Sequence, residues 1–398
     1  MQKMTVGTEK TFVRDPLTWL AYVMLAYVAY ALATLGPLMP FLRDELDLSY
    51  TLGGFLPAAV AVGIIVAGLT SDRLAHRWGR HRAFWGGGMG LAGAAVGLAL
   101  SGQFPLALLA VLGMGFFSSL TLIMIQAILS DQHGEQRTIA LTEANVGASL
   151  SATLAPLCIG LVQRAGVGWR GALFFALFIL AFVAVFFRRQ PVPNTASGAR
   201  PLSAQRVRLP LAFWLYWVVI CLVVSVEMCL VIWGADFLET VVGLSKIDAS
   251  TTLGVFLAAM LIGRLAGSRL ARAWPGTTLL LLALGITLIG FPIFWLARLA
   301  WVNVLGLFVA GLGVANLYPL TLSVAVGLAP EHSNTASARV SLGVGAALLT
   351  APLLLGWMAD RLSLQSAYGL VAVLLVTAIV VVFFNIRVLT RREAPAHS

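Results

Sequence analysis

Charged side chains are scarce in this sequence of 398 residues, because Asp, Glu, Lys and Arg together make up only 11% of it. A soluble globular domain carries roughly 25% charged residues, so a water-exposed exterior cannot be built from this composition. Hydrophobic residues reach 60%, and the mean hydropathy is +0.93. Lipid must therefore cover most of the surface, and we expect an all-α membrane protein.

Groups that could perform chemistry inside a membrane are also few. The three cysteines, Cys158, Cys221 and Cys229, lie in apolar runs and are expected to be free thiols. All five histidines fall in loops or in the tail, so no His, Cys and carboxylate cluster is expected within a span. A Gly-rich Lys-Ser/Thr phosphate-binding motif is lacking, as is a repeated filter segment. We expect no enzyme, metal, cofactor, ATP-driven pump or channel.

The formal net charge of +10 is explained by topology. The charges sit between long apolar runs and form no single patch, which argues against a nucleic-acid partner. With the N-terminus inside, 18 of the 26 Lys and Arg residues fall on the cytoplasmic side and six on the outer side. This bias predicts that both termini are cytoplasmic. The short loops and the lack of a targeting extension favour a bacterial inner membrane.

Twelve apolar runs are each long enough to cross the hydrocarbon, which takes about 20 residues. The stretch 189–209 is rich in Pro, Ser and Arg and is expected to be a cytoplasmic linker. It would separate two pseudo-symmetric six-helix bundles at 1–188 and 210–398. The expected spans are 17–42, 50–72, 83–101, 104–130, 137–163, 169–188, 210–238, 249–272, 277–297, 300–328, 333–359 and 364–389.

One passage occurs twice, which supports two related halves. Ala155-Pro156-Leu157 recurs as Ala351-Pro352-Leu353, with a glycine at the same spacing before and after each copy, 196 residues apart. Shorter matches recur at the same offset near 41–49 and 73–78. In a hydrophobic protein, duplicated halves with Gly/Pro-interrupted helices indicate a transporter that rocks around a central site.

The loop after the second span carries a motif of spaced glycines and charged residues. It contains Gly68, Asp72 and Arg73, followed by Gly79 and Arg80. Together with the twelve spans and the repeat, this motif resembles the signature of the Major Facilitator Superfamily, although Gly79 stands four positions late here. The resemblance implies twelve helices in a 6+6 arrangement, alternating access and a monomer. It also implies that the 50–72 span packs on the 333–359 span, and the 137–163 span on the 249–272 span.

The resemblance also gives an interpretation of two prolines. Pro156, with its repeat partner Pro352, resembles a degenerate form of the family's Gly-Pro antiporter motif. The arginine that many proton-coupled drug antiporters of the family carry in the fourth span is replaced by Leu109. Proton coupling, if present, then uses another group.

Four charged residues lie inside spans and need a reason, because such charges are costly. Glu143 and Arg339 lie near the cytoplasmic ends of their spans, and Arg264 lies in the cytoplasmic third of its span. The family's helix contacts would bring Asp72 near Arg339, and Glu143 near Arg264 or Arg269. We expect two ion pairs that close the cytoplasmic side and break when the halves rock. The alternative is static packing of snorkelling arginines.

Glu227 is the fourth of these charges and lies near the middle of the seventh span. The resemblance implies that this helix lines the central cavity. A carboxylate there could accept a proton or neutralise a cationic substrate. The alternative is a neutral carboxyl group held by a hydrogen bond to a neighbouring helix.

The other cavity helices implied by the resemblance offer an aromatic and weakly polar lining, for which packing is an equally good explanation. None of the spans 1, 4, 7 and 10 has a Lys or Arg at mid-depth, which disfavours anionic substrates. Candidate lining residues are Tyr27, Tyr30, Thr34, Ser119, Met124, Gln126, Trp233, Asn316 and Tyr318.

These observations predict a proton-coupled secondary transporter for a small organic solute. Export of drug-like, amphipathic or cationic compounds is the first expectation. Uptake of a neutral or cationic metabolite is the alternative, and a sensor with a transporter fold that binds ligand without flux is a further one.

Overall fold

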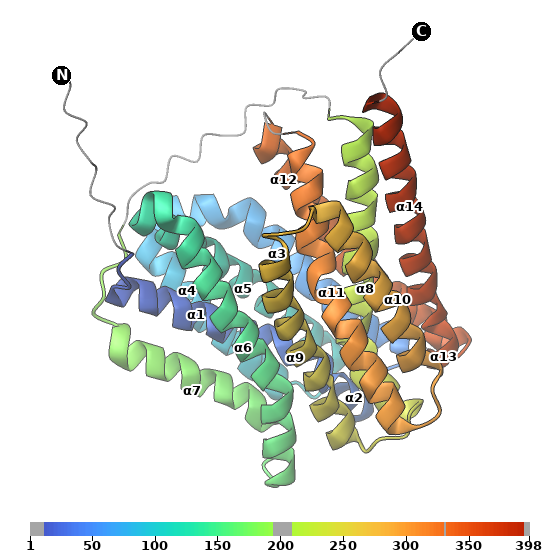
Figure 1. Ribbon diagram of the computed structural model, residues 1–398. Helices are drawn as coiled ribbons and strands as arrows, with labels where there is room; N and C mark the ends of the chain where they lie inside the picture. Colours follow the sequence, from blue (N-terminus) through green and yellow to red (C-terminus); the bar gives the residue numbers. More distant parts are fainter. Residues whose placement is uncertain (1–11, 194–208, 330–331, 394–398) are drawn as a thin grey trace, which may run out of the picture.

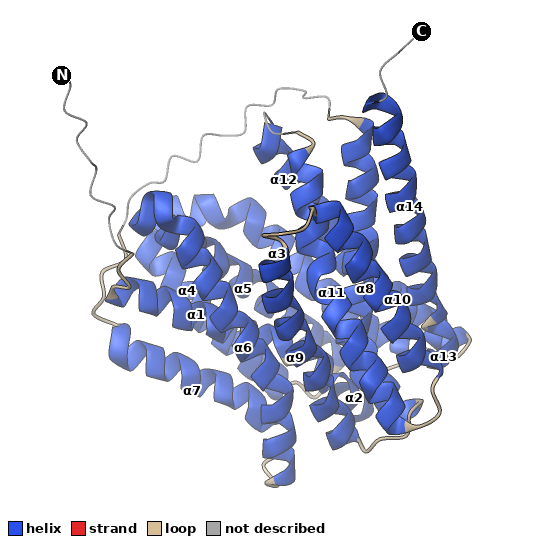
Figure 2. Cartoon of the chain, in the orientation of Figure 1, coloured by secondary structure: helices blue, strands red, loops and turns tan. Residues whose placement is uncertain are grey.

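The computed structural model describes residues 12–193, 209–329 and 332–393. Within these ranges the chain is helical and forms no strand (Figure 2). The helices are α1 (Pro16–Ala33), α2 (Leu35–Glu45), α3 (Tyr50–Trp78), α4 (Arg80–Ala99), α5 (Phe104–His133), η1 (Gly134–Gln136), α6 (Arg137–Arg164), α7 (Arg170–Phe187), α8 (Leu211–Thr240), α9 (Lys246–Leu270), α10 (Gly276–Leu296), α11 (Ala300–Gly327), α12 (Ser333–Arg361), α13 (Leu364–Ala367) and α14 (Gly369–Glu393).

Ten stretches of the described chain are long and apolar enough to cross a membrane. One of them, Phe104–Arg164, contains two helices, α5 and α6, which η1 separates. The glycine-rich α4 is not among the ten, because glycine adds little hydropathy. The expected all-α membrane protein is confirmed, whereas the count of twelve spans stays a prediction.

The first expected span is broken into α1 and α2. Its break at Thr34 follows from Pro37, which has no N–H and whose ring clashes with the carbonyl one turn earlier. Asp15 caps the start of α1 by accepting a hydrogen bond from the Thr18 N–H at 2.8 Å. The break leaves α2 free to tilt toward the second half of the chain.

We call α1–α7 the first helix group and α8–α14 the second helix group. The groups meet along α3 against α12, α6 against α9, and α2 against α8 and α9. The first two contacts are those that the family resemblance implied. In Figure 1 the start of α1 and the end of α14 lie toward one end of the molecule, which we call the termini end, and α2 and α13 lie toward the other. The predicted domain boundary falls largely on 194–208, outside the described residues, and stays a prediction.

The internal repeat extends to the way helices approach one another. Gly63 lets α3 approach α5 so closely that an added Cβ would lie 2.2 Å from the Leu112 carbonyl oxygen. Gly263 does the same for α9 and α11, where an added Cβ would lie 2.5 Å from the Leu312 carbonyl oxygen. Equivalent helix pairs in the two groups therefore depend on equivalent glycines.

The repeated prolines lie at the interface between the groups. Pro156 on α6 lies 3.5 Å from a Cβ added at Gly254 on α9. Pro352 on α12 lies beside Gly54 on α3, where an added Cβ would lie 3.3 Å from the Pro352 carbonyl oxygen. In each group, the helical turn that contains the proline thus packs against a glycine of the other group.

A matched pair of glycine substitutions tests these close approaches. Gly63→Ala should lower the Tm of the purified protein, because the added Cβ collides with the α5 backbone and overpacking costs about 1–3 kcal/mol. Gly93→Ala on α4 is the control, since an added Cβ there meets nothing within 4 Å. Equal Tm values for both variants would contradict the close packing of α3 and α5.

Candidate functional site

A cavity of about 320 Å³ lies between the two helix groups. Residues of α1, α2, α3 and α6 line one side of it, and residues of α8, α9 and α12 line the other. Its lining is apolar except for Ser149, Thr153, Glu227 and Arg264. Ligand sites of about this size are usually apolar with a few convergent polar groups, so this cavity is the candidate substrate site.

The polar part of the cavity is one cluster. Arg264 on α9 places Nη2 3.8 Å from Glu227 Oε1 on α8. Its Nη1 donates a hydrogen bond of 3.2 Å to the Ser149 hydroxyl on α6. The Glu227 side chain is 17% exposed and the Arg264 side chain 46% exposed. Arg264 therefore connects an acid of its own group to a hydroxyl of the other group across the cavity.

In this structure Glu143 has a different partner from the one expected. Arg14 binds the Glu143 carboxylate with two nitrogens, at 2.8 and 2.5 Å, and the Tyr22 hydroxyl donates to it at 3.0 Å. Tyr22 and Glu143 belong to the first helix group, and Arg14 directly precedes it. Arg264 pairs with Glu227 instead, and Arg269 is exposed near the end of α9. Arg14, in the tail before the first span, reaches Glu143 without crossing between the groups, and the expected pair of Glu143 in the conformation closed at that end stays a prediction.

The expected pair of Asp72 and Arg339 is not formed in this structure. Both residues are exposed, and no ion pair joins them within the described chain. The Arg339 carbonyl oxygen accepts a hydrogen bond of 2.7 Å from Trp217 Nε1, within the second helix group. The polar contacts between the groups cluster at the opposite end of α3 and α12, which leaves the termini end of these helices without this pair.

The loop motif separates into a solvent-facing part and a helix junction. Gly68 has no neighbour within 4 Å of an added Cβ, and Arg73 is exposed like Asp72. Gly79 ends α3 with φ at +81°, a conformation that favours glycine. Arg80 begins α4, is buried, and binds Asp131 at the end of α5 at 2.6 Å. The motif therefore ties α4 to α5.

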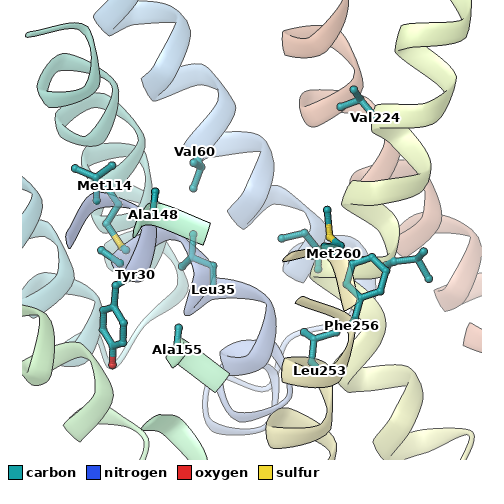
Figure 3. Packing of buried hydrophobic residues seen from close by; sticks show 14 of the residues in the cluster. Tyr30, Leu35, Val60, Met114, Ala148, Ala155, Val224, Leu253, Phe256 and Met260 are labelled. Carbon is teal, nitrogen blue, oxygen red and sulfur yellow. The ribbon is translucent and has the colours of Figure 1, made fainter. Parts of the chain in front are cut away.

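The candidates on the first span do not line the cavity. Tyr27 and Tyr30 are buried, and their hydroxyls donate to the carbonyl oxygens of Gly88 at 3.1 Å and Ala172 at 3.0 Å. Thr34 is buried and donates to the Ala31 carbonyl oxygen of its own helix. In Figure 3 the Tyr30 ring does not point toward Leu35 or Met260, which line the cavity. In this structure these three side chains pack within the first helix group.

Most other predicted lining residues also lie outside the cavity. Ser119 and Met124 are buried, whereas Gln126 is exposed near the end of α5. Tyr318 is half-buried, and Asn316 donates to the Gly263 carbonyl oxygen at 2.8 Å, where it joins α11 to α9. Glu227 is the one predicted binding residue that the cavity contains, together with Arg264 and Pro352 from the predicted gating set.

An ion pair joins the two groups at the end of the molecule opposite the termini end. Arg43 on α2 binds Asp236 on α8 at 2.5 Å, with side chains 17% and 1% exposed. The Arg43 guanidinium also lies over the Tyr50 ring, 3.4 Å from its centroid. The Tyr50 ring meets Trp233 edge-on, and Trp233 Nε1 donates to the Pro352 carbonyl oxygen at 2.8 Å. We call this end the closed end.

Polar contacts at the rim of the closed end add to this pair. The Asp360 carboxylate at the end of α12 accepts hydrogen bonds from the Tyr50 and Thr51 N–H groups and so caps α3 across the interface. At the equivalent place, Arg164 binds Asp248 at 2.7 Å. Two further contacts join α2 to α9: Lys246 binds Asp44 at 2.7 Å, and the Ser250 hydroxyl donates to the Pro37 carbonyl oxygen at 2.7 Å.

Sequence reasoning missed Arg43, Asp236 and Asp360. Each lies at the end of a span, where a charge is ordinary and attracts no attention. The available signal was their position: the outer ends of spans 1 and 7 carry charges of opposite sign, and the repeat places these ends on the same side of the membrane.

Comparison with known proteins identifies the family. A model of the Major Facilitator Superfamily matches residues 18–315 and 300–398. The chain therefore belongs to the Major Facilitator Superfamily and is a multi-pass membrane transporter, not an enzyme. It is 25% identical to an uncharacterised MFS-type transporter of Yersinia pestis over 367 residues, which covers 88% of this chain and 92% of the relative.

Solved structures confirm the fold. The chain is similar to a bacterial homologue of the human lysosomal transporter Spinster in an inward-facing, occupied conformation, with a TM-score of 0.71, 18% identity and 93% and 95% of the two chains covered. It is also similar to a nucleoside transporter, with a TM-score of 0.74, 11% identity and 93% and 99% coverage. A D-xylose–proton symporter is similar with a TM-score of 0.73 and 15% identity, and the match covers 93% of this chain and 96% of the symporter.

Removing the buried carboxylate should open the closed end. Asp236→Asn leaves the Arg43 guanidinium buried without a counter-charge, which costs about 3–5 kcal/mol. Spin labels at Asp47→Cys and Arg361→Cys, one in each helix group, should then report longer distances. These labels require a background without the three native cysteines.

Asp248→Asn is the control for this experiment. It removes an ion pair at the same end whose side chains are 60% and 52% exposed, and such pairs contribute at most about 1 kcal/mol. The label distances should stay close to those of the parent protein. Identical distance distributions in both variants would rule out the Arg43–Asp236 pair as the contact that holds this end closed.

Proposed function

We propose that this protein is a proton-coupled secondary transporter that moves a small, largely apolar organic solute through the cavity between its helix groups by alternating access. The observation that carries the proposal is the Glu227–Arg264 pair, the charged part of a lining to which both groups contribute. A charge in such a place is usually functional. Glu227 is the proton acceptor in this scheme.

The distribution of contacts supports alternating access. Hydrogen bonds and ion pairs between the groups cluster at the closed end, whereas Asp72, Arg269 and Arg339 are exposed toward the termini end. We propose that the termini are cytoplasmic in a bacterial inner membrane, which makes this conformation inward-facing. The Asp72–Arg339 pair would then form when the groups rock to the outward-facing conformation. We propose the monomer as the transporting unit.

The direction of transport depends on how the proton and the solute share the cavity. Export of drug-like cations, the direction first expected from the sequence, corresponds to a proton and a cation that compete for Glu227. Uptake corresponds to a proton and a solute that bind together. The position of Arg264 favours uptake, in which proton and solute bind together, because it places a cation beside Glu227.

Proton movement through Glu227 can be measured in proteoliposomes. Solutes from a broad panel are added outside vesicles that contain a pH-sensitive dye, and a transported solute should produce a dye signal with the wild-type protein. Glu227→Gln should abolish the signal, because an amide does not take up the proton. The loss should be at least about tenfold, as for removal of an acid–base group.

Glu239→Gln is the matched control on the same helix. Glu239 lies near the closed end, 3.7 Å from Lys246, so its amide should leave proton movement intact. An undiminished proton signal in Glu227→Gln would exclude Glu227 as the coupling group. Solute flux without any proton movement in the wild type would reject proton coupling itself.

A further inference from the structure

The cavity contains a guanidinium whose hydrogen-bonding capacity is largely unused. We propose that the transported solute carries a carboxylate on a small apolar body, and that Arg264 binds this carboxylate. The inference rests on the proposed function, since it assigns a substrate class to the same cavity. It also revises the expectation that the cavity lacks a cation, because the cation comes from α9, which sequence reasoning had not placed in the lining.

The contacts of Arg264 leave donors available. A guanidinium carries five N–H donors in a planar fork. One hydrogen bond is formed, from Nη1 to Ser149 Oγ at 3.2 Å. The distance of 3.8 Å from Nη2 to Glu227 Oε1 is too long for a hydrogen bond. The side chain is 46% exposed while it lines the cavity, so a bound carboxylate can take the fork in the bidentate geometry that arginine favours.

The rest of the lining suits an apolar body. Leu257, Met260 and Leu261 lie on α9 near Arg264, and Val60 and Ile64 face them from α3. These side chains provide no fixed hydrogen-bond donor for a sugar or another polyhydroxylated solute. Methionine adapts to differently shaped apolar groups. The cavity therefore combines one anion-binding group with an adaptable apolar wall.

Glu227 opposes this binding when it is charged and permits it when it is neutral. A carboxylate bound to Arg264 would lie close to Glu227, and two negative charges in apolar surroundings repel each other strongly. Protonation of Glu227 removes this repulsion and releases Arg264 from its present partner. By reciprocity, a bound carboxylate also favours protonation of Glu227. Proton and solute thus bind together, which is the arrangement for cotransport in the same direction.

A cationic solute is the less favourable occupant. It would have to approach Glu227, which is only 17% exposed against 46% for Arg264. Its positive charge would then lie beside the Arg264 guanidinium. No second acid lines the cavity among the described residues, so Glu227 alone would have to balance both positive charges.

Calorimetric titration of the purified full-length protein tests the proposal. The probes are hexanoate and phenylbutyrate, each compared with the primary amide and the primary amine of the same carbon skeleton. Wild-type protein at mildly acidic pH should bind the carboxylates roughly tenfold to a hundredfold more tightly than the amides, as expected for charge-assisted hydrogen bonds. The carboxylates should bind more weakly as the pH is raised.

Three variants complete the design. Arg264→Gln should remove the preference for the carboxylate, and Arg264→Lys should retain part of it because the charge remains. Glu227→Gln should bind the carboxylates at mildly alkaline pH as tightly as the wild type does at acidic pH. Arg269→Gln, which removes an exposed arginine on the same helix, should behave like the wild type and controls for binding to the detergent or lipid.

Several outcomes would overturn the proposal. One is equal carboxylate binding by the wild type and Arg264→Gln, and another is no carboxylate binding by the wild type at any pH tested. A third is tightest binding of the amines with loss of that binding in Glu227→Gln. The third outcome rejects the carboxylate class but keeps the proposed proton-coupled transport, whereas an undiminished proton signal in Glu227→Gln vesicles rejects Glu227 as the coupling group.

Discussion

The buried Arg43–Asp236 ion pair is the contact on which the observed arrangement of the two helix groups depends. One hydrogen bond joins the two side chains, and Arg43 Nε and Asp236 Oδ2 are buried without a partner among the described residues. A buried pair of this kind gains little net energy, because desolvation offsets most of the attraction. Removing only one of the two charges is nevertheless costly, because the other charge is left buried without a partner. Two arrangements of the pair are therefore favourable. Both side chains are paired when this end is closed, or both are hydrated when it opens.

The other charged pair, Glu227 on α8 with Arg264 on α9, differs from the Arg43–Asp236 pair in its distance and its surroundings. Glu227 and Arg264 are separated by 3.8 Å and line the cavity, whereas Arg43 and Asp236 are 2.5 Å apart and the Arg43 guanidinium lies over the Tyr50 ring. A ligand does not easily replace one partner of a tightly hydrogen-bonded pair. A longer-range pair with unused donors can bind a ligand more easily. In the proposed mechanism the two pairs therefore have different roles: the Arg43–Asp236 pair stabilises the conformation, and the Glu227–Arg264 pair binds the proton and the solute.

Much of the fold was predictable from the sequence, but little of the site was. Long apolar runs and a repeat of 196 residues indicate the helices and their equivalence, because periodicity and length are local properties. The sequence left binding and packing as equal alternatives for Tyr27 and Tyr30, because a polar atom within a span can be satisfied by a neighbouring backbone carbonyl, as at Gly88 and Ala172. Helix rotation decides between these roles, and the sequence of one helix does not specify its rotation against the others.

The repeat constrains where the groups touch and leaves the chemistry of the contact open. Arg164 and Asp360 occupy equivalent positions 196 residues apart, at the closed-end termini of α6 and α12. Each meets the start of a helix in the other group, one as a cation on Asp248 and the other as an anion on two N–H groups. The Asp360 contact is favoured by the helix dipole of α3, and the Arg164 contact needs an acid on α9. The two sides of the interface therefore share their geometry and differ in their chemistry, so the two helix groups need not separate at the same free-energy cost along α3 and along α9.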